Sequence, residues 1–256
     1  MIFESHAHYD DDAFNEDRGS LLETMKDNNV GCIINVAANL DSVKTTMELA
    51  DRYDFIYGAV GVHPSDTEEL NDENMEWMRQ QAKKDKCVAI GEVGLDYHYP
   101  DPERSIQRKW FERQLILARE INKPVIIHSR EAAADTMDIL RSSVAANIRG
   151  VMHCYSYSVE TAKELLKMGF YFGVGGVVTF SNAKKLVEAV EYIPMDKILL
   201  ETDCPYLAPT PHRGERNSSL FLPLVAQRIA DIKKISYDEV VEITEKNARR
   251  LFFEKE

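Results

Sequence analysis

Apolar and polar positions along the chain follow two alternating patterns. Short runs rich in Val and Ile, such as 31–36 and 87–92, are typical of strands buried on both faces. The longer stretches between such runs repeat apolar residues at helical spacing, as Trp110 and Leu117 do within 102–122. We predict strands at 2–8, 31–36, 55–61, 87–92, 124–128, 148–153, 170–174 and 197–203. Helices are predicted at 19–29, 41–53, 102–122, 131–145, 158–168, 217–232 and 237–251, with a further one starting at the Ser65-x-x-Glu68 capping pattern.

Strand-then-helix units of this kind, eight of them in 256 residues, fit a (β/α)8 TIM barrel better than an open doubly wound sheet. No linker, repeat or low-complexity segment divides the chain, so we predict a single domain over 1–256. The glycines of 173–176 could form a phosphate-binding loop. Because no Gly-Lys-Ser/Thr follows them, a tight turn or close packing is the better interpretation.

Composition narrows the class of protein. With 44% hydrophobic and 29% charged residues, and no apolar run long enough for a membrane span, the chain reads as a globular protein. Since the first strand begins at Ile2, a cleaved leader would remove it, and we expect a cytoplasmic protein without membrane contact. Four widely spaced cysteines predict buried thiols rather than disulfides. The net charge of −12 argues against wrapping duplex nucleic acid, but leaves binding of a chain end open.

Histidines and carboxylates recur where the predicted strands end. His6 and His8 are two residues apart, so on a strand they point to the same side and can grip a transition metal. In a barrel the C-terminal ends of all strands meet at one mouth. The side chains expected there are His6, His8, His63, Glu92, His128, His153 and Asp203. This set exceeds what one metal needs and suits two divalent ions of Mg, Mn or Zn type, with one carboxylate spanning both.

Successive motifs along the whole chain resemble the signatures of the TatD family of metal-dependent deoxyribonucleases, a branch of the amidohydrolase-type barrels. The motifs occupy 5–8, 61–64, 89–97, 124–130, 153–156, 201–207 and 213–217. The resemblance implies a divalent-metal hydrolase of DNA, in some members a 3′-to-5′ exonuclease. Two departures from the family pattern stand out: Glu4 replaces an Asp, and Tyr155-Ser156-Tyr157 replaces Phe-Ser-Gly.

The resemblance also implies roles for individual residues. His6, His8, Glu92 and Asp203 would hold one ion, and Glu92, His128 and His153 the other. Glu92 would thus act in catalysis through both ions, and His63 and Arg130 would contact substrate. An aromatic loop at 97–99 follows Glu92, and either base stacking or loop packing explains it.

The chemistry of phosphodiester hydrolysis assigns further roles. Asp203, the last carboxylate of the barrel, can bind metal and accept the proton of a water. Arg213 and Arg216 form a basic loop in an acidic protein, which favours phosphate contact over a solvated surface cluster. The predicted substrate is single-stranded DNA or a chain end.

Two other functions are consistent with the same residues. A hydrolase of a small amide, lactone or ester could use the same ligands, and a non-catalytic metal-dependent binding protein could keep the barrel as a scaffold. A substrate panel separates the first from a nuclease, and a turnover assay with and without chelator separates the second.

Overall fold

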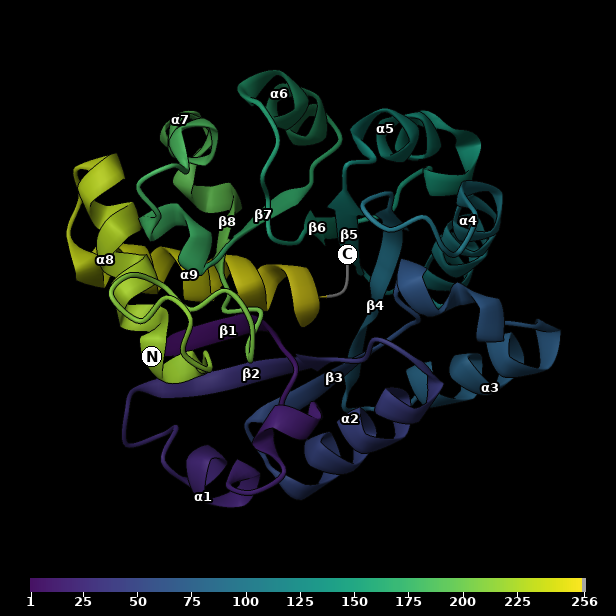
Figure 1. Ribbon diagram of the computed structural model, residues 1–256, viewed down its shortest axis with the longest axis horizontal. Helices are drawn as coiled ribbons and strands as arrows, with labels where there is room; N and C mark the ends of the chain where they lie inside the picture. Colours follow the sequence, from purple (N-terminus) through teal and green to yellow (C-terminus); the bar gives the residue numbers. More distant parts are fainter. Residues whose placement is uncertain (255–256) are drawn as a thin grey trace. The chain divides into compact units, whose positions relative to one another are not determined.

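Strands and helices alternate along the chain in the computed structural model, which describes residues 1–254 (Figure 1). The chain divides into two compact units. We call Met1–Asn35 with Cys154–Glu256 the terminal unit, and Val36–His153 the central unit. The predicted single domain over 1–256 stays a prediction, and its last two residues lie outside the described ones.

Eight strands form a sheet in which spatial order follows chain order, and each described pairing is parallel. The strands are β1 (Ile2–Ala7), β2 (Val30–Val36), β3 (Ile56–Val60), β4 (Cys87–Asp96), β5 (Val125–Arg130), β6 (Gly150–Met152), β7 (Tyr171–Val174) and β8 (Ile198–Leu200). A parallel bridge joins Ala7, the last residue of β1, to Cys204, which follows β8. With a helix after nearly every strand, this order confirms the predicted (β/α)8 barrel fold.

The helices follow the order of the sequence pattern but not all of its bounds: the helix predicted at 19–29 ends at Glu23, and the one predicted at 131–145 ends at Arg141. They are α1 (Arg18–Glu23), α2 (Leu40–Arg52), α3 (Asp72–Ala82), α4 (Arg104–Glu120), α5 (Ala133–Arg141), α6 (Val159–Lys167), α7 (Lys184–Tyr192), α8 (Leu222–Lys233) and α9 (Tyr237–Phe252). The Ser65 capping prediction is wrong, because Pro64–Glu69 is a 3-10 helix capped by His63 and α3 begins after Asn71. The helix predicted from 217 begins at Leu222, after a 3-10 turn, and α7 was not predicted.

In the central unit, helices cover the outer side of the strands. Figure 1 shows α2 outside β3 and α4 beside β4. The α2 helix begins with a capping box in which Asn39 and Ser42 exchange hydrogen bonds. Trp110 and Phe111 of α4 are buried, as the helical spacing of apolar residues predicts.

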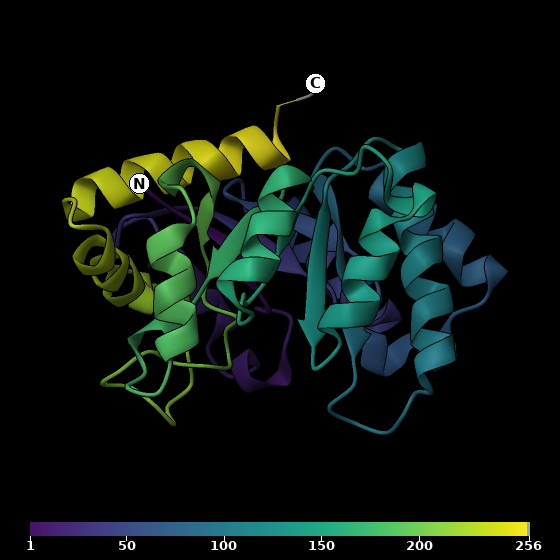
Figure 2. The ribbon, with the colours of Figure 1, turned by 90° about the horizontal axis from the view of Figure 1, so that it is seen from above.

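In the terminal unit, β1 packs against the last helix. Figure 2 shows α9 running beside the N-terminal end of the chain, where the Met1 amino group pairs with Glu245 at 3.0 Å. The Phe3 ring stacks on Phe252 of α9 with centroids 6.1 Å apart. Since side chains alternate along a strand, Glu4 and His6 lie on the face opposite Phe3. This alternation turns two ionisable groups away from the helix.

The helices of residues 1–254 are short or carry many charged residues. Within that part of the chain, none combines the length and the apolar character that crossing a bilayer requires.

Gly94 allows a close approach between β4 and β5. Its φ is +150°, and a Cβ added there would overlap the carbonyl oxygen of His128. Gly214 also has a positive φ of +90°, but an added Cβ would meet nothing within 4 Å. We expect Gly94→Ala to lower the free energy of unfolding by about 3 kcal/mol or more, through strain and displacement of the β5 backbone. Gly214→Ala, the matched control, should cost about 1 kcal/mol from backbone conformation alone.

Denaturant unfolding of both variants measures the difference. Equal losses of stability in the two would mean that the close approach at Gly94 has no role.

Candidate metal centre

Three donors meet at the ends of β1 and β8 in the terminal unit, and we call them the β1/β8 group. His6 lies in β1, His8 directly follows it, and Asp203 lies in the loop three residues after β8. The backbone N–H of Asp203 donates to the carbonyl of His6, and its φ of +59° is in the left-handed region. Hydrogen bonding therefore holds the Asp203 backbone in a conformation that few residues other than Gly adopt.

The spacing of these donors fits one divalent ion. The Nε2 atoms of His6 and His8 lie 3.0 Å apart, and Oδ1 of Asp203 is 3.7 Å from the first and 3.4 Å from the second. Ligand atoms held at about 2.1 Å by one tetrahedral or octahedral ion lie roughly 3.0–3.4 Å apart. The Asp203 side chain is 17% exposed, so solvent reaches the group. Two imidazoles and a carboxylate form a donor set suited to Zn or Mn.

Glu4 supports the β1/β8 group from within the core. Its carboxyl accepts hydrogen bonds from the backbone N–H groups of Thr202 (2.9 Å) and His6 (3.2 Å), and contacts the hydroxyls of Thr202 (2.7 Å) and Ser219 (2.9 Å). Burial raises the pKa of Glu4 to about 8, although these hydrogen bonds lower it. The contacts tie β1 to the segment that carries Asp203, so Glu4 positions two of the three donors.

A second set of donors lies in the central unit, within β4 and β5 and just after β3 and β6, and we call it the β4/β5 group. It consists of His63, Glu92, His128 and His153. Oε1 of Glu92 is 2.7 Å from Nδ1 of His128, 3.5 Å from Nε2 of His153 and 3.9 Å from Nε2 of His63. Glu92 is therefore the carboxylate around which three imidazoles gather. His63, Glu92 and His128 can offer ligand atoms that all lie within 4.8 Å of one another.

Asp96 completes the surroundings of His128. Its Oδ2 is 3.1 Å from Nε2 of His128, and its Oδ1 accepts from the backbone N–H of His98 at 2.9 Å. Burial raises the pKa of Asp96, but the hydrogen bonds from His128 and His98 lower it below its ordinary value. Because an ionised carboxylate can only accept, Nε2 of His128 carries a proton and Nδ1 faces Glu92. This is the carboxylate–histidine arrangement found behind metal-bound imidazoles.

The His128 imidazole lies between two carboxylates. Burial lowers its pKa, but the hydrogen bonds to Asp96 and Glu92 raise it above the ordinary value. Without an ion, the imidazole can donate to both carboxylates. A divalent ion would take the place of the proton on Nδ1, and the Asp96 contact would remain.

Glu201 is a buried carboxylate in the terminal unit that the sequence analysis did not select. Its Oε1 accepts from the backbone N–H of Cys154 at 2.6 Å. A Cβ on Gly173 would overlap the Glu201 carboxyl, so the bare glycine makes room for it. A Cβ on Gly176 would overlap the carbonyl of Leu207. Close packing, as predicted for 173–176, is therefore confirmed.

The predicted substrate residues have different surroundings. Arg130 is exposed at the end of β5, with its guanidinium over the Tyr99 ring at 5.6 Å. Arg213 is exposed and lies over Phe180 at 4.1 Å. Arg216 binds both oxygens of Asp17, at 2.7 and 2.6 Å, and also donates to a backbone carbonyl. Of the two basic-loop residues, Arg213 is the better placed for phosphate.

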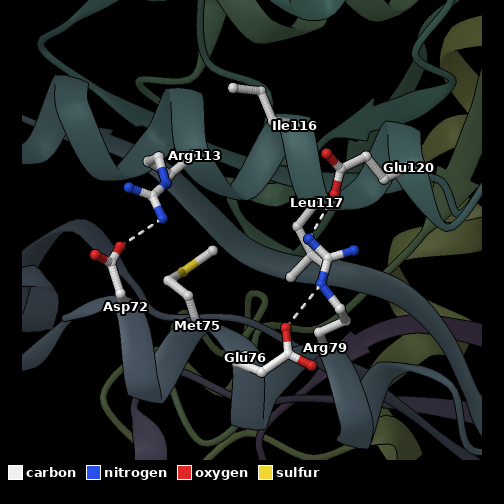
Figure 3. Close-up of a pocket in the computed structure, with 8 residues that line it drawn as sticks. All are labelled: Asp72, Met75, Glu76, Arg79, Arg113, Ile116, Leu117 and Glu120. Atoms are coloured by element: carbon white, nitrogen blue, oxygen red, sulfur yellow. Dashed lines mark hydrogen bonds and ion pairs between the residues drawn. The ribbon is translucent and has the colours of Figure 1, made fainter.

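A pocket between α3 and α4 of the central unit is lined by apolar residues and ion pairs, unlike the two donor groups (Figure 3). Its apolar lining residues are Met75, Ile116 and Leu117, and its charged side chains pair with one another. Arg113 contacts Asp72 at 2.7 Å, and Arg79 lies between Glu76 and Glu120. No histidine or cysteine lines it, so the pocket carries structural ion pairs rather than reactive groups.

Sequence reasoning missed Asp96, and the predicted limits of a strand explain why. The apolar run ends at 92, and Gly94 suggests a break, whereas β4 continues to Asp96. Had the strand been extended, alternation would have placed Asp96 on the same face as Glu92.

We expect Asp96→Asn to weaken divalent-ion binding at the β4/β5 group by about 10- to 100-fold. If the single amide oxygen accepts from His98, the amide NH2 faces Nε2 of His128, which favours the imidazole tautomer with its proton on Nδ1. Competition titration against a fluorescent chelator measures the affinity. Asp135→Asn, on α5, is the control, because Asp135 pairs with Tyr97 and Arg108 outside the group. Unchanged affinity in folded Asp96→Asn protein would refute the positioning role.

Comparison with known proteins identifies close relatives. The family model described as TatD related DNase matches residues 3–253. The uncharacterized metal-dependent hydrolase YabD of Bacillus subtilis is 42% identical over 98% of this chain and 99% of its own. The uncharacterized metal-dependent hydrolase YcfH of Escherichia coli is 37% identical over 98% of this chain and 96% of its own.

A solved structure extends the likeness to three dimensions. The crystal structure of YJJV, a TatD homologue from Escherichia coli, has a TM-score of 0.90 and 30% sequence identity, covering 98% of this chain and 97% of its own. The family match over residues 3–253, the two relatives and this structure all point to the same family. This chain belongs to the TatD family of metal-dependent hydrolases.

Proposed function

We propose that the chain hydrolyses phosphodiester bonds of DNA at the ends of single strands, with one divalent ion at each donor group. The observation that carries the proposal is the convergence of His6, His8 and Asp203, with donor atoms 3.0–3.7 Å apart. The family description, which refers to DNases, supports DNA as the substrate. Mg, Mn or Zn as the native metal and cytoplasm as the location stay predictions.

The ions are assigned to residues as follows. His6, His8 and Asp203 would hold one ion, and Glu92, His128 and His153 the other. When bound, such ions supply Lewis acidity, which lowers the pKa of water and neutralises charge on phosphate oxygens. The role of Glu92 at both ions stays an implication of the family resemblance.

The remaining chemistry belongs to the side chains of this protein. Asp203 is a partly exposed carboxylate, and we assign it as acceptor of the proton from the attacking water. Arg130 and Arg213 are exposed guanidiniums that can neutralise charge on the phosphate in the transition state. His63, whose ring lies 4.3 Å from that of His128, is assigned to contact substrate.

We expect hydrolysis of a single-stranded oligonucleotide to stop on chelation and to return when Mg or Mn is added, because the ions supply the Lewis acidity. A 5′-labelled oligonucleotide with a free 3′ end should shorten stepwise, and the same oligonucleotide with a blocked 3′ end should persist. The His6→Ala/His8→Ala variant should stay inactive at the same metal concentrations. Faster turnover of small esters or amides than of DNA would instead assign the amidohydrolase function. Activity that survives complete metal removal would exclude both.

Asp203→Asn separates proton transfer from metal binding. The substitution keeps one oxygen for the ion but removes basicity, so turnover should fall by about 100-fold or more while the Michaelis constant changes little. Metal content and the melting temperature should stay near those of the wild type. Asp196→Asn, an exposed carboxylate just before β8, is the matched control and should leave turnover unchanged. Steady-state kinetics beside metal analysis gives the answer, and a metal-replete Asn variant within a few-fold of wild type would rule out the assigned role.

A further inference from the structure

Tyr99 is a large aromatic side chain left open to solvent beside the β4/β5 group. It follows the last residue of β4 by three positions, and 55% of its surface is exposed. The other large apolar side chains of residues 1–254 with comparable exposure are Met1, Tyr192, Tyr206 and Leu207. Tyr206 donates its hydroxyl hydrogen to Asp11 at 2.8 Å, and Tyr192 lies at the end of α7. In the central unit, Tyr99 is therefore the exposed aromatic ring at a strand end.

The loop that carries Tyr99 is held in place by its neighbours. The backbone N–H of Tyr97 donates to the carbonyl of Arg130 at 2.9 Å. The imidazole of His98 pairs with Glu131 at 2.8 Å and packs edge-on against Tyr99, with centroids 4.9 Å apart. Ordering such a loop on binding costs conformational entropy, and here much of that ordering is already present.

The guanidinium of Arg130 lies beside the Tyr99 ring. Arg130 lies over Tyr99 at 5.6 Å and is paired in register with Asp96 across the two strands. Arg130 is two residues from His128 in β5, so the Tyr99 ring and the Arg130 guanidinium lie near the end of the strand that carries this donor. An aromatic face beside a cation is how proteins hold unpaired nucleotides, the base by stacking and the phosphate by charge.

Charge around the loop limits how much of a strand can bind. Asp101 and Glu103 follow Tyr99, and Glu131 lies beside His98. These carboxylates repel a polyanion that runs along the surface, and the chain carries a net charge of −12. One ring and one guanidinium suffice for a single terminal nucleotide.

We infer that Tyr99 is the platform on which the terminal base of a single-stranded nucleic acid stacks, while Arg130 contacts the adjacent phosphate. The inference rests on the proposed function, and it adds to that function a residue that recognises the base. Stacking contributes equally before and during the reaction, so its loss should raise the Michaelis constant and leave turnover at saturation unchanged.

The test is binding of a short oligonucleotide with 2-aminopurine at its 3′ end and a phosphorothioate at the last linkage, in the presence of Mg. Tyr99→Ala should weaken binding about 10-fold or more and reduce the quenching of 2-aminopurine, while Tyr99→Trp should retain both. Tyr192→Ala is the matched control, since Tyr192 is 48% exposed and also has a cation, Lys163, over its ring. It should bind as the wild type does.

An oligonucleotide with an abasic 3′ end completes the design. Wild type and Tyr99→Ala should bind it equally, because no base is present to stack. The inference would be overturned if Tyr99→Ala bound the 2-aminopurine oligonucleotide within twofold of the wild-type affinity. It would also be overturned if Tyr99→Ala lost as much affinity for the abasic oligonucleotide as for the one with a terminal base. If the oligonucleotide binds through Tyr99 but is not hydrolysed, the nuclease function alone is refuted. If it is hydrolysed and Tyr99→Ala changes neither binding nor the Michaelis constant, the role of Tyr99 in base stacking alone is refuted.

Discussion

Buried carboxylates and imidazoles in and just after the strands must find partners inside the protein, and this requirement shapes both donor groups. His6, Glu92 and His153 are almost completely buried, and burying such groups is costly unless each meets a partner. In the β4/β5 group, Glu92 is the shared partner of three imidazoles. In the β1/β8 group, hydrogen bonds to Glu4 connect β1 with Thr202, next to Asp203. Gly173 leaves the space that the buried Glu201 carboxyl fills.

The barrel order could be predicted because buried parallel strands and amphipathic helices have different periods. The donors could be predicted because His6 and His8 are two residues apart on a strand, and the other donors follow later apolar runs. Contacts between segments far apart in the chain could not be predicted from the sequence. Nothing in the local pattern pairs Glu201 with Cys154 or Arg216 with Asp17, since each pair forms only when segments far apart in the chain meet. The Ser65 capping pattern failed because local capping signals are shared by 3-10 turns and α-helices.

The acidic composition and a nucleic-acid substrate are compatible if recognition is confined to a chain end. Arg216, which looked like a phosphate ligand in the sequence, is held by Asp17, so fewer cations remain for a polyanion. Arg130 and Arg213 remain exposed, and each lies over an aromatic ring. One exposed guanidinium beside an aromatic ring suits a single nucleotide better than a long stretch of nucleic-acid backbone.

Anomalous diffraction can show whether both donor groups bind metal ions. Crystals of the full-length protein grown with Mn would be measured at the manganese absorption edge. We expect one anomalous peak among His6, His8 and Asp203, and another among Glu92, His128 and His153, at about 2.0–2.3 Å from the donor atoms. Manganese bound elsewhere, with no peak at either group at saturating concentration, would contradict this expectation.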